Sequence, residues 1–142
     1  MAHYAQTVNV IGCIKTTKTG AFFFSTALPL MLYRHHYGSI PIEGVGDHDV
    51  LSLDVVAAWT ADRKGITIGV VNPNREAHRL ELKAEGIAAG AAGTRWTITG
   101  DDPSWTNDSD GEQVKIAEQP VRYDPSLQVA PLSVTLLCFP VR

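Results

Sequence analysis

The clearest pattern in the chain is an alternation of apolar and polar positions over residues 51–71. Because successive side chains of a strand point to opposite faces, residues 51–59 and 66–71 each predict a strand with an apolar face. Residues 62–65 join the two segments and close with glycine, which suits a type I turn followed by a bulge. Asn-Pro-Asn at residues 72–74 ends the second strand. We predict a β-hairpin at the centre of one β-sheet.

Further strands follow the hairpin, separated by glycine-rich and polar loops. They are predicted at residues 78–83, 94–99, 113–117, 127–129 and 132–139. The last of these is apolar on both faces toward its end, which is typical of a strand in the middle of a sheet or between layers. Seven strands with turn residues between them predict an antiparallel β-sandwich, so we expect a mainly β protein.

The start of the chain follows a different pattern. Tyr4, Val8, Ile11 and Ile14 recur at helical spacing and predict a first helix, although the β-branched residues among them disfavour it. A segment this short cannot bury its own apolar face. It therefore has to pack against something else.

A second helix is predicted over residues 26–38, where the punctuation is clearer. Thr26 is a suitable N-cap, and Pro29 falls in the first turn, where its missing N–H costs nothing. Cationic side chains near the end suit the helix dipole, and Gly38 suits the C′ position. Residues 39–49 contain glycine and proline and predict a linker to the all-β part.

The composition excludes some classes of partner. The chain has 142 residues, of which 44% are hydrophobic and 19% charged, with a net charge of −3. This is typical of a soluble globular protein. There is no basic stripe, and no apolar run approaches the roughly 18–20 residues of a membrane span, so we expect neither nucleic acid nor a membrane as partner. The first residues lack the pattern of a signal peptide, so a cytoplasmic location is expected.

The two cysteines, Cys13 and Cys138, lie far apart in the sequence. They fit neither a disulfide scaffold nor a Cys-x-x-Cys metal site. Because free cysteine behaves as a small hydrophobic residue, we predict two buried thiols.

Few residues are arranged for catalysis. Glycoside hydrolysis needs two carboxyl groups roughly 5–9.5 Å apart, whereas the glutamates of this chain predict solvated surface charge. They are Glu43, Glu76, Glu81, Glu85, Glu112 and Glu118. His35 and His36 are adjacent in a predicted helix and point to different faces, and no zinc, phosphate or dinucleotide motif occurs. We predict no catalytic residue, no metal and no other cofactor.

The acidic loop at residues 101–112 allows two interpretations. Residues 108–111 resemble half of a calcium-binding loop, but Thr106 and Ala117 occupy positions where ligands would be needed. We interpret the segment as an ordinary surface loop. A bound cation is the alternative.

The three tryptophans could form a platform on which a sugar ring stacks. Trp59 and Trp96 fall on apolar strand faces, which favours a place in the core. Trp105 lies in the polar loop and is expected to be exposed. Trp105 is therefore a candidate substrate-binding residue.

Several segments, in order, resemble α-L-arabinofuranosidases of glycoside hydrolase family 51. Residues 2–11 resemble a segment late in the catalytic barrel of that family, which commonly reads Ala-Asn-Ile-Ala-Gln-x-Val-Asn. Residues 26–38 are similar to a helix of the family that ends near a Tyr-x-x-His-x-Gly pattern. The resemblance continues at residues 70–74, 100–113 and 131–137 and covers nearly the whole chain.

This resemblance implies a C-terminal piece of an enzyme that pairs a (β/α)8 barrel with a β-sandwich. Residues 1–40 would be the last portion of the barrel, and residues 41–142 a jelly-roll-like sandwich of about seven or more strands. The family releases terminal α-L-arabinofuranosyl residues through two glutamates that lie upstream of the matched segments, so neither has a counterpart here. Gln6 matches a family glutamine that resembles a sugar-contacting residue, while His3 stands where the family usually has Asn.

The resemblance favours a non-catalytic, structural domain that packs on the upstream barrel. Arabinose-containing glycans would then be partners only through the parent enzyme. Without the barrel the apolar faces of residues 1–40 lack partners, so a homo-oligomer is expected. Two alternatives stay open: a carbohydrate-binding module that uses exposed aromatic residues, and an independent small enzyme with two converging carboxylates.

Overall fold

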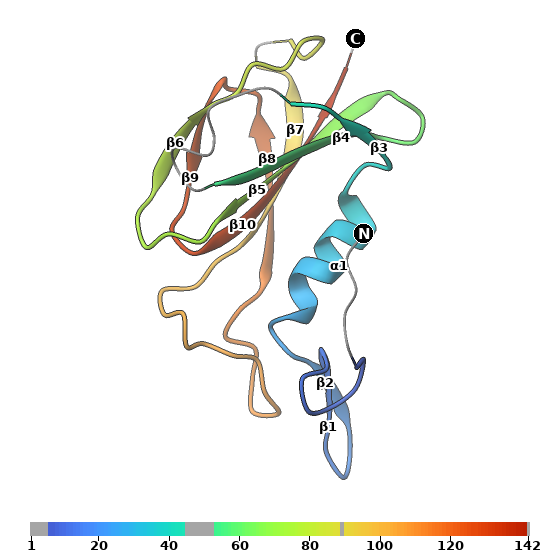
Figure 1. Ribbon diagram of the computed structural model, residues 1–142, viewed down its shortest axis with the longest axis vertical. Coiled ribbons are helices and arrows are strands. Elements are labelled where there is room, and N and C mark those ends of the chain that lie inside the picture. The colour runs from blue at the N-terminus through green and yellow to red at the C-terminus, as the bar shows by residue number, and fades with distance from the viewer. Residues whose placement is uncertain (1–5, 45–52, 89, 142) are drawn as a thin grey trace.

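The computed structural model describes residues 6–44, 53–88 and 90–141. The described part is mainly β, with a short helix between the second and third strands (Figure 1). In chain order the elements are β1 (Ile14–Thr16), β2 (Ala21–Phe23), α1 (Ala27–His36), β3 (Ile40–Ile42), β4 (Asp54–Trp59), β5 (Gly65–Asn72), β6 (His78–Glu81), β7 (Ala92–Ile98), β8 (Ile116–Arg122), β9 (Ser126–Val129) and β10 (Ser133–Pro140).

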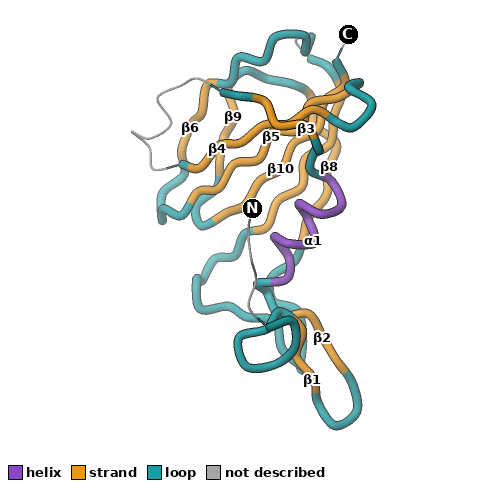
Figure 2. The backbone as a smooth tube through the Cα atoms, turned by 45° about the vertical axis from the view of Figure 1, so that its right-hand side comes forward, coloured by secondary structure: helices purple, strands orange, loops and turns teal. Residues whose placement is uncertain are grey.

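Two antiparallel sheets of unequal size form the sandwich. The larger sheet has the strand order β3-β4-β5-β10-β7-β8, and the smaller pairs β6 with β9 (Figure 2). The predicted hairpin is confirmed as β4 and β5, which pair with Val55 opposite Val70. Residues 51 and 52 of the predicted first strand lie outside the described residues. Strand β10, predicted to be buried, lies between β5 and β7. The fold class predicted from the alternation is therefore correct.

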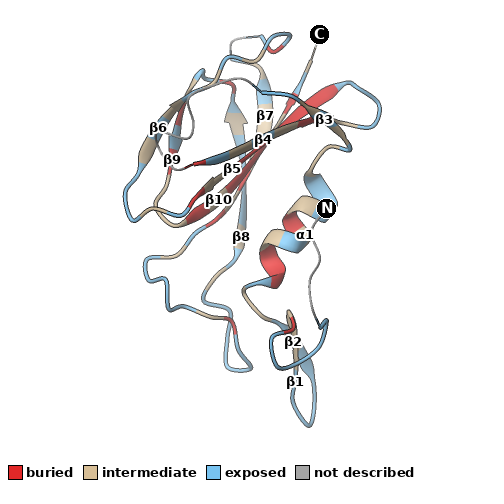
Figure 3. Ribbon diagram, viewed as in Figure 1, coloured by how far each residue is buried: buried red, intermediate tan, exposed pale blue. Residues whose placement is uncertain are grey.

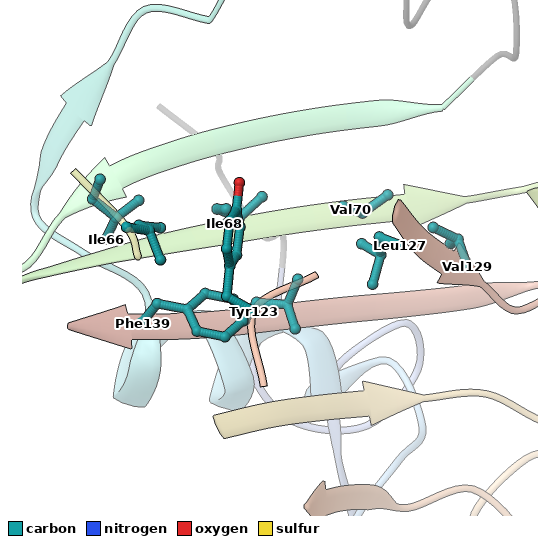
Figure 4. Packing of buried hydrophobic residues seen from close by; sticks show 9 residues of the cluster. Ile66, Ile68, Val70, Tyr123, Leu127, Val129 and Phe139 are labelled. Carbon is teal, nitrogen blue, oxygen red and sulfur yellow. The ribbon is translucent and has the colours of Figure 1, made fainter. Parts of the chain in front are cut away.

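The main core lies between the two sheets. Side chains from β5 and β10 meet side chains from β9 there, as Figure 4 shows. The buried members are Ile66, Ile68, Val70, Ile87, Tyr123, Leu127, Val129, Leu137 and Phe139. The rings of Tyr123 and Phe139 pack edge to face with centroids 5.3 Å apart. Burial of these aliphatic and aromatic groups is the main force that holds the layers together.

The helix α1 covers the opposite face of the larger sheet. Leu28 and Leu32 pack there against Trp96, Ile98 and Leu136. Figure 3 shows the buried and exposed sides of this helix. The predicted second helix is thus confirmed, and it packs on the sandwich.

The residues at both ends of α1 agree with the predicted start and stop signals of the helix, with differences in detail. Thr26 is the N-cap residue, but it makes no side-chain cap hydrogen bond. The helix ends at His36; its C-cap residue Tyr37 is extended, and Gly38 follows. A Cβ at Gly38 would lie 2.4 Å from the carbonyl oxygen of Trp59, so glycine is required there by the close approach to β4.

The predicted first helix is wrong. The described residues from 6 to 25 form the short hairpin β1–β2, in which Ile14 pairs with Phe23, and Gln6, Asn9 and Val10 have left-handed φ angles of 56°, 55° and 45°. Repeated left-handed residues are incompatible with a right-handed helix. The apolar positions reflect β-branched strand and turn residues, and Tyr4 lies outside the described residues.

Three local predictions also need correction. The linker expected at residues 39–49 begins with β3, where Pro41 is tolerated because β3 is an edge strand. Residues 45–49 of this linker lie outside the described residues. In the β4–β5 turn the left-handed residue is Arg63 (φ 57°), and Gly65 is the first residue of β5. Cys13 and Cys138 are free but half-buried rather than buried. The domain boundary between residues 40 and 41 stays a prediction.

Candidate functional site

The loop between β7 and β8 is held in a defined shape by a buried asparagine. Asn107 is 2% exposed; its Nδ2 donates to the carbonyl oxygen of Val114 and its Oδ1 accepts from the Val114 N–H, both at 2.9 Å. The same two bonds explain why β8 begins at Ile116 rather than at the predicted residue 113. The backbone of Val114 is engaged by the loop, so it is not available to the ladder.

Trp105 projects from this ordered loop. Asp102 accepts hydrogen bonds from the N–H and hydroxyl of Ser104 at 2.8 and 2.7 Å, and these bonds lower the pKa of Asp102. The Trp105 N–H donates to the Asp102 carbonyl oxygen at 3.1 Å. The indole ring packs over Gly100 and remains 36% exposed. The predicted exposure of Trp105 is therefore confirmed, and its position is fixed by the turn beneath it.

Gln6 lies in the exposed segment that leads into β1. This segment is held to β1 by Asn9, whose Oδ1 accepts from the Thr16 N–H at 2.9 Å. Figures 1 and 2 both place the β1–β2 hairpin and the β7–β8 loop toward the same end of the molecule. The two predicted site residues thus belong to segments at one end. No hydrogen bond between them is found in the part of the chain that the structure describes.

The other two tryptophans do not form a sugar platform. Trp96 is 8% exposed; its Nε1–H donates to Glu118 Oε2 at 2.9 Å, and its ring stacks on His36 with centroids 4.2 Å apart. Trp59 is half-buried and packs against the main core. The prediction that Trp96 belongs to the core is confirmed. Trp105 thus lacks a coplanar tryptophan partner.

The carboxylates of the described residues do not converge on a cleft. All six glutamates are exposed, as are the aspartates of the described residues. An open cavity of about 380 Å³ lies beside the β4–β5 turn, and Asp62 is the one carboxylate among its lining residues. Asp62 accepts from Thr60 Oγ1 at 2.7 Å and from the Lys64 N–H, and these bonds lower its pKa. The cavity therefore offers no acid and base pair.

The described ranges contain neither a cluster of metal-ligating side chains nor a helix that could span a membrane. Within residues 6–44, 53–88 and 90–141, no three histidine, cysteine, aspartate or glutamate side chains gather as a metal site. In the acidic loop, Asp108 Oδ1 instead accepts the N–H groups of Asp110 and Gly111. Across the described residues, no helix is both long and apolar enough to cross a bilayer.

Several solved structures share the fold of this chain. The chain superposes on an α-L-arabinofuranosidase from Thermotoga maritima, in complex with arabinose, with a TM-score of 0.79 at 24% identity; this covers 96% of this chain and 33% of that one. A thermostable family 51 α-L-arabinofuranosidase from Thermotoga petrophila gives a TM-score of 0.78 at 24% identity, covering 94% and 32%. A β-porphyranase of family 86 from Bacteroides plebeius gives 0.65 at 10% identity, covering 93% and 22%. The fold is therefore a β-rich portion found in glycoside hydrolases.

A sequence profile of one family narrows this class. The α-L-arabinofuranosidase C-terminal domain profile matches residues 1–134. The chain therefore belongs to the α-L-arabinofuranosidase C-terminal domain family. It spans about a third of the length of the two Thermotoga enzymes. A comparison with curated protein sequences gives no match.

Proposed function

We propose that this domain is the non-catalytic part of an enzyme that removes terminal α-L-arabinofuranosyl residues from glycans, and that it packs on a catalytic barrel. The observation that carries the proposal is the family match over residues 1–134 combined with the dispersed, exposed carboxylates. A retaining or inverting glycosidase needs two carboxyl groups on either side of one bond. The described residues do not provide that arrangement, so the proposal assigns catalysis to the rest of the enzyme.

The surface that meets the barrel is the apolar segment around β1 and β2. Its large apolar side chains are exposed to different degrees: Val8 46%, Val10 78%, Ile11 62% and Phe23 49%. Scattered apolar residues are normal on a surface, but several within one short segment indicate a contact. In the parent enzyme, strands and helices of the barrel would cover this segment.

Gln6 and Trp105 are proposed to reach the sugar from the domain side. Trp105 is suited to this role because its loop is pre-formed by Asn107 and Asp102, so little conformational entropy is lost when a ligand binds. In the parent enzyme, Trp105→Ala is expected to raise KM for an arabinofuranoside with a smaller effect on kcat. A KM equal to that of the wild type would exclude this contact.

The direct test is hydrolysis of 4-nitrophenyl α-L-arabinofuranoside. The 142-residue chain is expected to be inactive, and activity is expected when the upstream barrel sequence is present. Activity from the chain alone would contradict the proposal and would place the catalytic groups among the surface carboxylates.

We also propose that the chain without its barrel associates with itself through the same exposed segment. Analytical ultracentrifugation is expected to show a dimer or larger species at micromolar concentration, and Val10→Asp is expected to shift it toward monomer. A monomer at all concentrations, with residues 6–25 ordered, would rule this out.

A further inference from the structure

A polar strip crosses the inner face of the larger sheet at β7 and β8. Directly paired residues of neighbouring strands share a face. Leu137 pairs with Arg95, and Arg95 pairs with Gln119. Because Leu137 lies in the core between the layers, Arg95 and Gln119 project from this same inner face.

The adjacent row of the sheet is also polar at this side. Thr135 pairs with Thr97, and Thr97 pairs with Ala117. Thr135 is fully buried, and its Oγ1 has no hydrogen-bond partner among the described residues. The inner face thus changes from aliphatic side chains on β5 to the guanidinium of Arg95, the hydroxyl of Thr97 and the amide of Gln119, which lies between the apolar residues Ala117 and Val121 on β8. An inner face that was meant to be covered by apolar residues would not show this change.

The strip is open because the second layer is narrow. The two strands β6 and β9 oppose six, and Figure 2 shows them at the left of the view with β8 toward the right. Gln119 and Ala117 are exposed, whereas Arg95 and Thr97 are half-buried. Figure 3 shows β8 mainly in the colour of exposed residues. A ligand can therefore reach the strip from the β8 side.

Arg95 is charged and only partly satisfied. Its Nε donates to Thr97 Oγ1 and its Nη2 to the carbonyl oxygen of Gln128 on β9, both at 3.2 Å. Its remaining N–H groups have no acceptor in the described part of the chain. Burial lowers the pKa of Arg95, because the charged form loses solvent. No carboxylate among the described residues forms an ion pair with it, whereas Arg79 on the other layer pairs with Glu81 at 3.5 Å.

We propose that the strip formed by Arg95, Thr97 and Gln119 binds a sugar that carries a carboxylate, that is, a uronic acid unit of a glycan. The guanidinium presents parallel N–H groups that match the two oxygens of a carboxylate. The Gln119 amide and the Thr97 hydroxyl suit the hydroxyl groups of the sugar ring. The choice of a glycan rests on the proposed function, while the need for a carboxylate rests on Arg95.

The test is a binding titration of the 142-residue chain with trigalacturonate. Binding is monitored by calorimetry and by the NMR signal of the Arg95 Nε–H. We expect saturable binding that weakens as salt is added, since the contact is ionic. Neutral arabinotriose is expected not to shift the Arg95 signal. Because hydrolysis is not measured, failure of this site is distinguishable from failure of the proposed arabinofuranosidase function.

Three variants locate the contact. Arg95→Gln is expected to weaken trigalacturonate binding at least tenfold, and Arg95→Lys, which keeps the charge but loses the fork, is expected to weaken it less. Arg79→Gln removes the same charge from the outer layer and is expected to bind like the wild type. If Arg95→Gln does not fold, as judged by circular dichroism, the affinity of Arg95→Lys and the salt dependence of binding still test whether Arg95 makes the contact.

Several results would overturn the proposal. One is no binding at millimolar trigalacturonate, and another is equal loss of binding in Arg95→Gln and Arg79→Gln. Displacement by inorganic phosphate at the same concentration as the trisaccharide would show a general anion site instead. If the remaining polypeptide of the full enzyme covers Arg95, so that trigalacturonate no longer shifts its NMR signal, the strip would be assigned to an intramolecular contact.

Discussion

The segment from residue 6 to 25 and the six-stranded sheet follow different physical rules. The strands β1 and β2 have three residues each, and the surrounding apolar side chains are largely exposed. In contrast, β5 and β10 have eight residues each and bury side chains on both faces. The sheet therefore holds its own core, whereas the first segment presents apolar surface outward. A domain can be complete in one part and dependent on a partner in another.

The helix α1 belongs with the sheet although it follows the first segment in the chain. Its inner residues Leu28 and Leu32 pack against the sheet, and Leu32 is fully buried. Leu30, on its other side, is 42% exposed. The physical division therefore falls before α1, near residue 25. The predictions below test this division, and the first three each pair a change in the sheet or α1 with a control variant.

The largest effect is expected from Leu136→Ala on β10. Leu136 is fully buried under α1, so truncation should cost about 2–5 kcal/mol of unfolding free energy through lost burial and a residual cavity. Val10→Ala in the first segment should change stability by no more than about 0.5 kcal/mol. Urea unfolding measures both values. Equal losses would show that the first segment is part of the same core.

A close approach of two strands predicts the next effect. A Cβ at Gly93 would lie 2.4 Å from both the Cys138 carbonyl oxygen and the Phe139 ring, so Gly93→Ala should cost about 1–3 kcal/mol through overpacking. Nothing lies within 4 Å of a Cβ at Gly20 in the β1–β2 turn. Gly20→Ala should therefore be neutral or stabilise by up to about 1 kcal/mol. Thermal unfolding compares the two, and a large loss at Gly20 would contradict the division.

The ring stack between α1 and β7 predicts a smaller effect. His36 stacks on Trp96 at an interplanar angle of 24°, so His36→Ala should cost about 0.5–1.5 kcal/mol. His35→Ala is the matched control, because it makes the same change at an exposed position of the same helix turn. Tryptophan fluorescence should shift only in the first variant. Identical shifts would mean that α1 does not rest on Trp96 in solution.

The smallest effect at neutral pH is expected from Tyr33, which tests α1 at high pH. Burial, and then the nearby Tyr37 and Asp54, raise the pKa of Tyr33 from 10.0 to about 12. Because this folded-state pKa lies above the unfolded value, the neutral phenol stabilises the fold below pH 10. That contribution is lost as the pH rises from 10 toward 12. Tyr33→Phe should flatten the decline in stability over this window, as absorbance at 295 nm and unfolding curves would show. An unchanged decline would place the Tyr33 phenol in solvent.

The sequence pattern predicted the elements whose packing is local and alternating. The hairpin β4–β5 and the buried β10 have long period-two patterns, so their existence did not depend on distant residues. In contrast, β1 and β2 bury few side chains, so their apolar residues do not alternate between a buried and an exposed face. Strand β3 was not predicted because Pro41 lies in it. The pairing of β6 with β9 joins distant parts of the chain and has no local signal.

The same reasoning explains the candidate sites. The exposure of Trp105 could be predicted because turn residues surround it, while the Asn107 clamp that orders its loop could not. Arg95 occupies a position that reads as an ordinary polar site on an alternating strand. Its proposed role in binding a carboxylate can be inferred only when the width of the second layer is known. The alternation of apolar and polar residues in the sequence does not show which part of a sheet face is left uncovered by the second layer.

Hydrogen exchange tests the division between the two regions most directly. It would be measured by mass spectrometry on this chain alone and on the proposed parent enzyme. Amides of β5 and β10 are expected to be strongly protected in both samples. Amides of residues 8–24 are expected to be protected only in the proposed parent enzyme, where the barrel would cover them. Equal protection of residues 8–24 in both samples would contradict the account, because the first segment would then be stable without a partner.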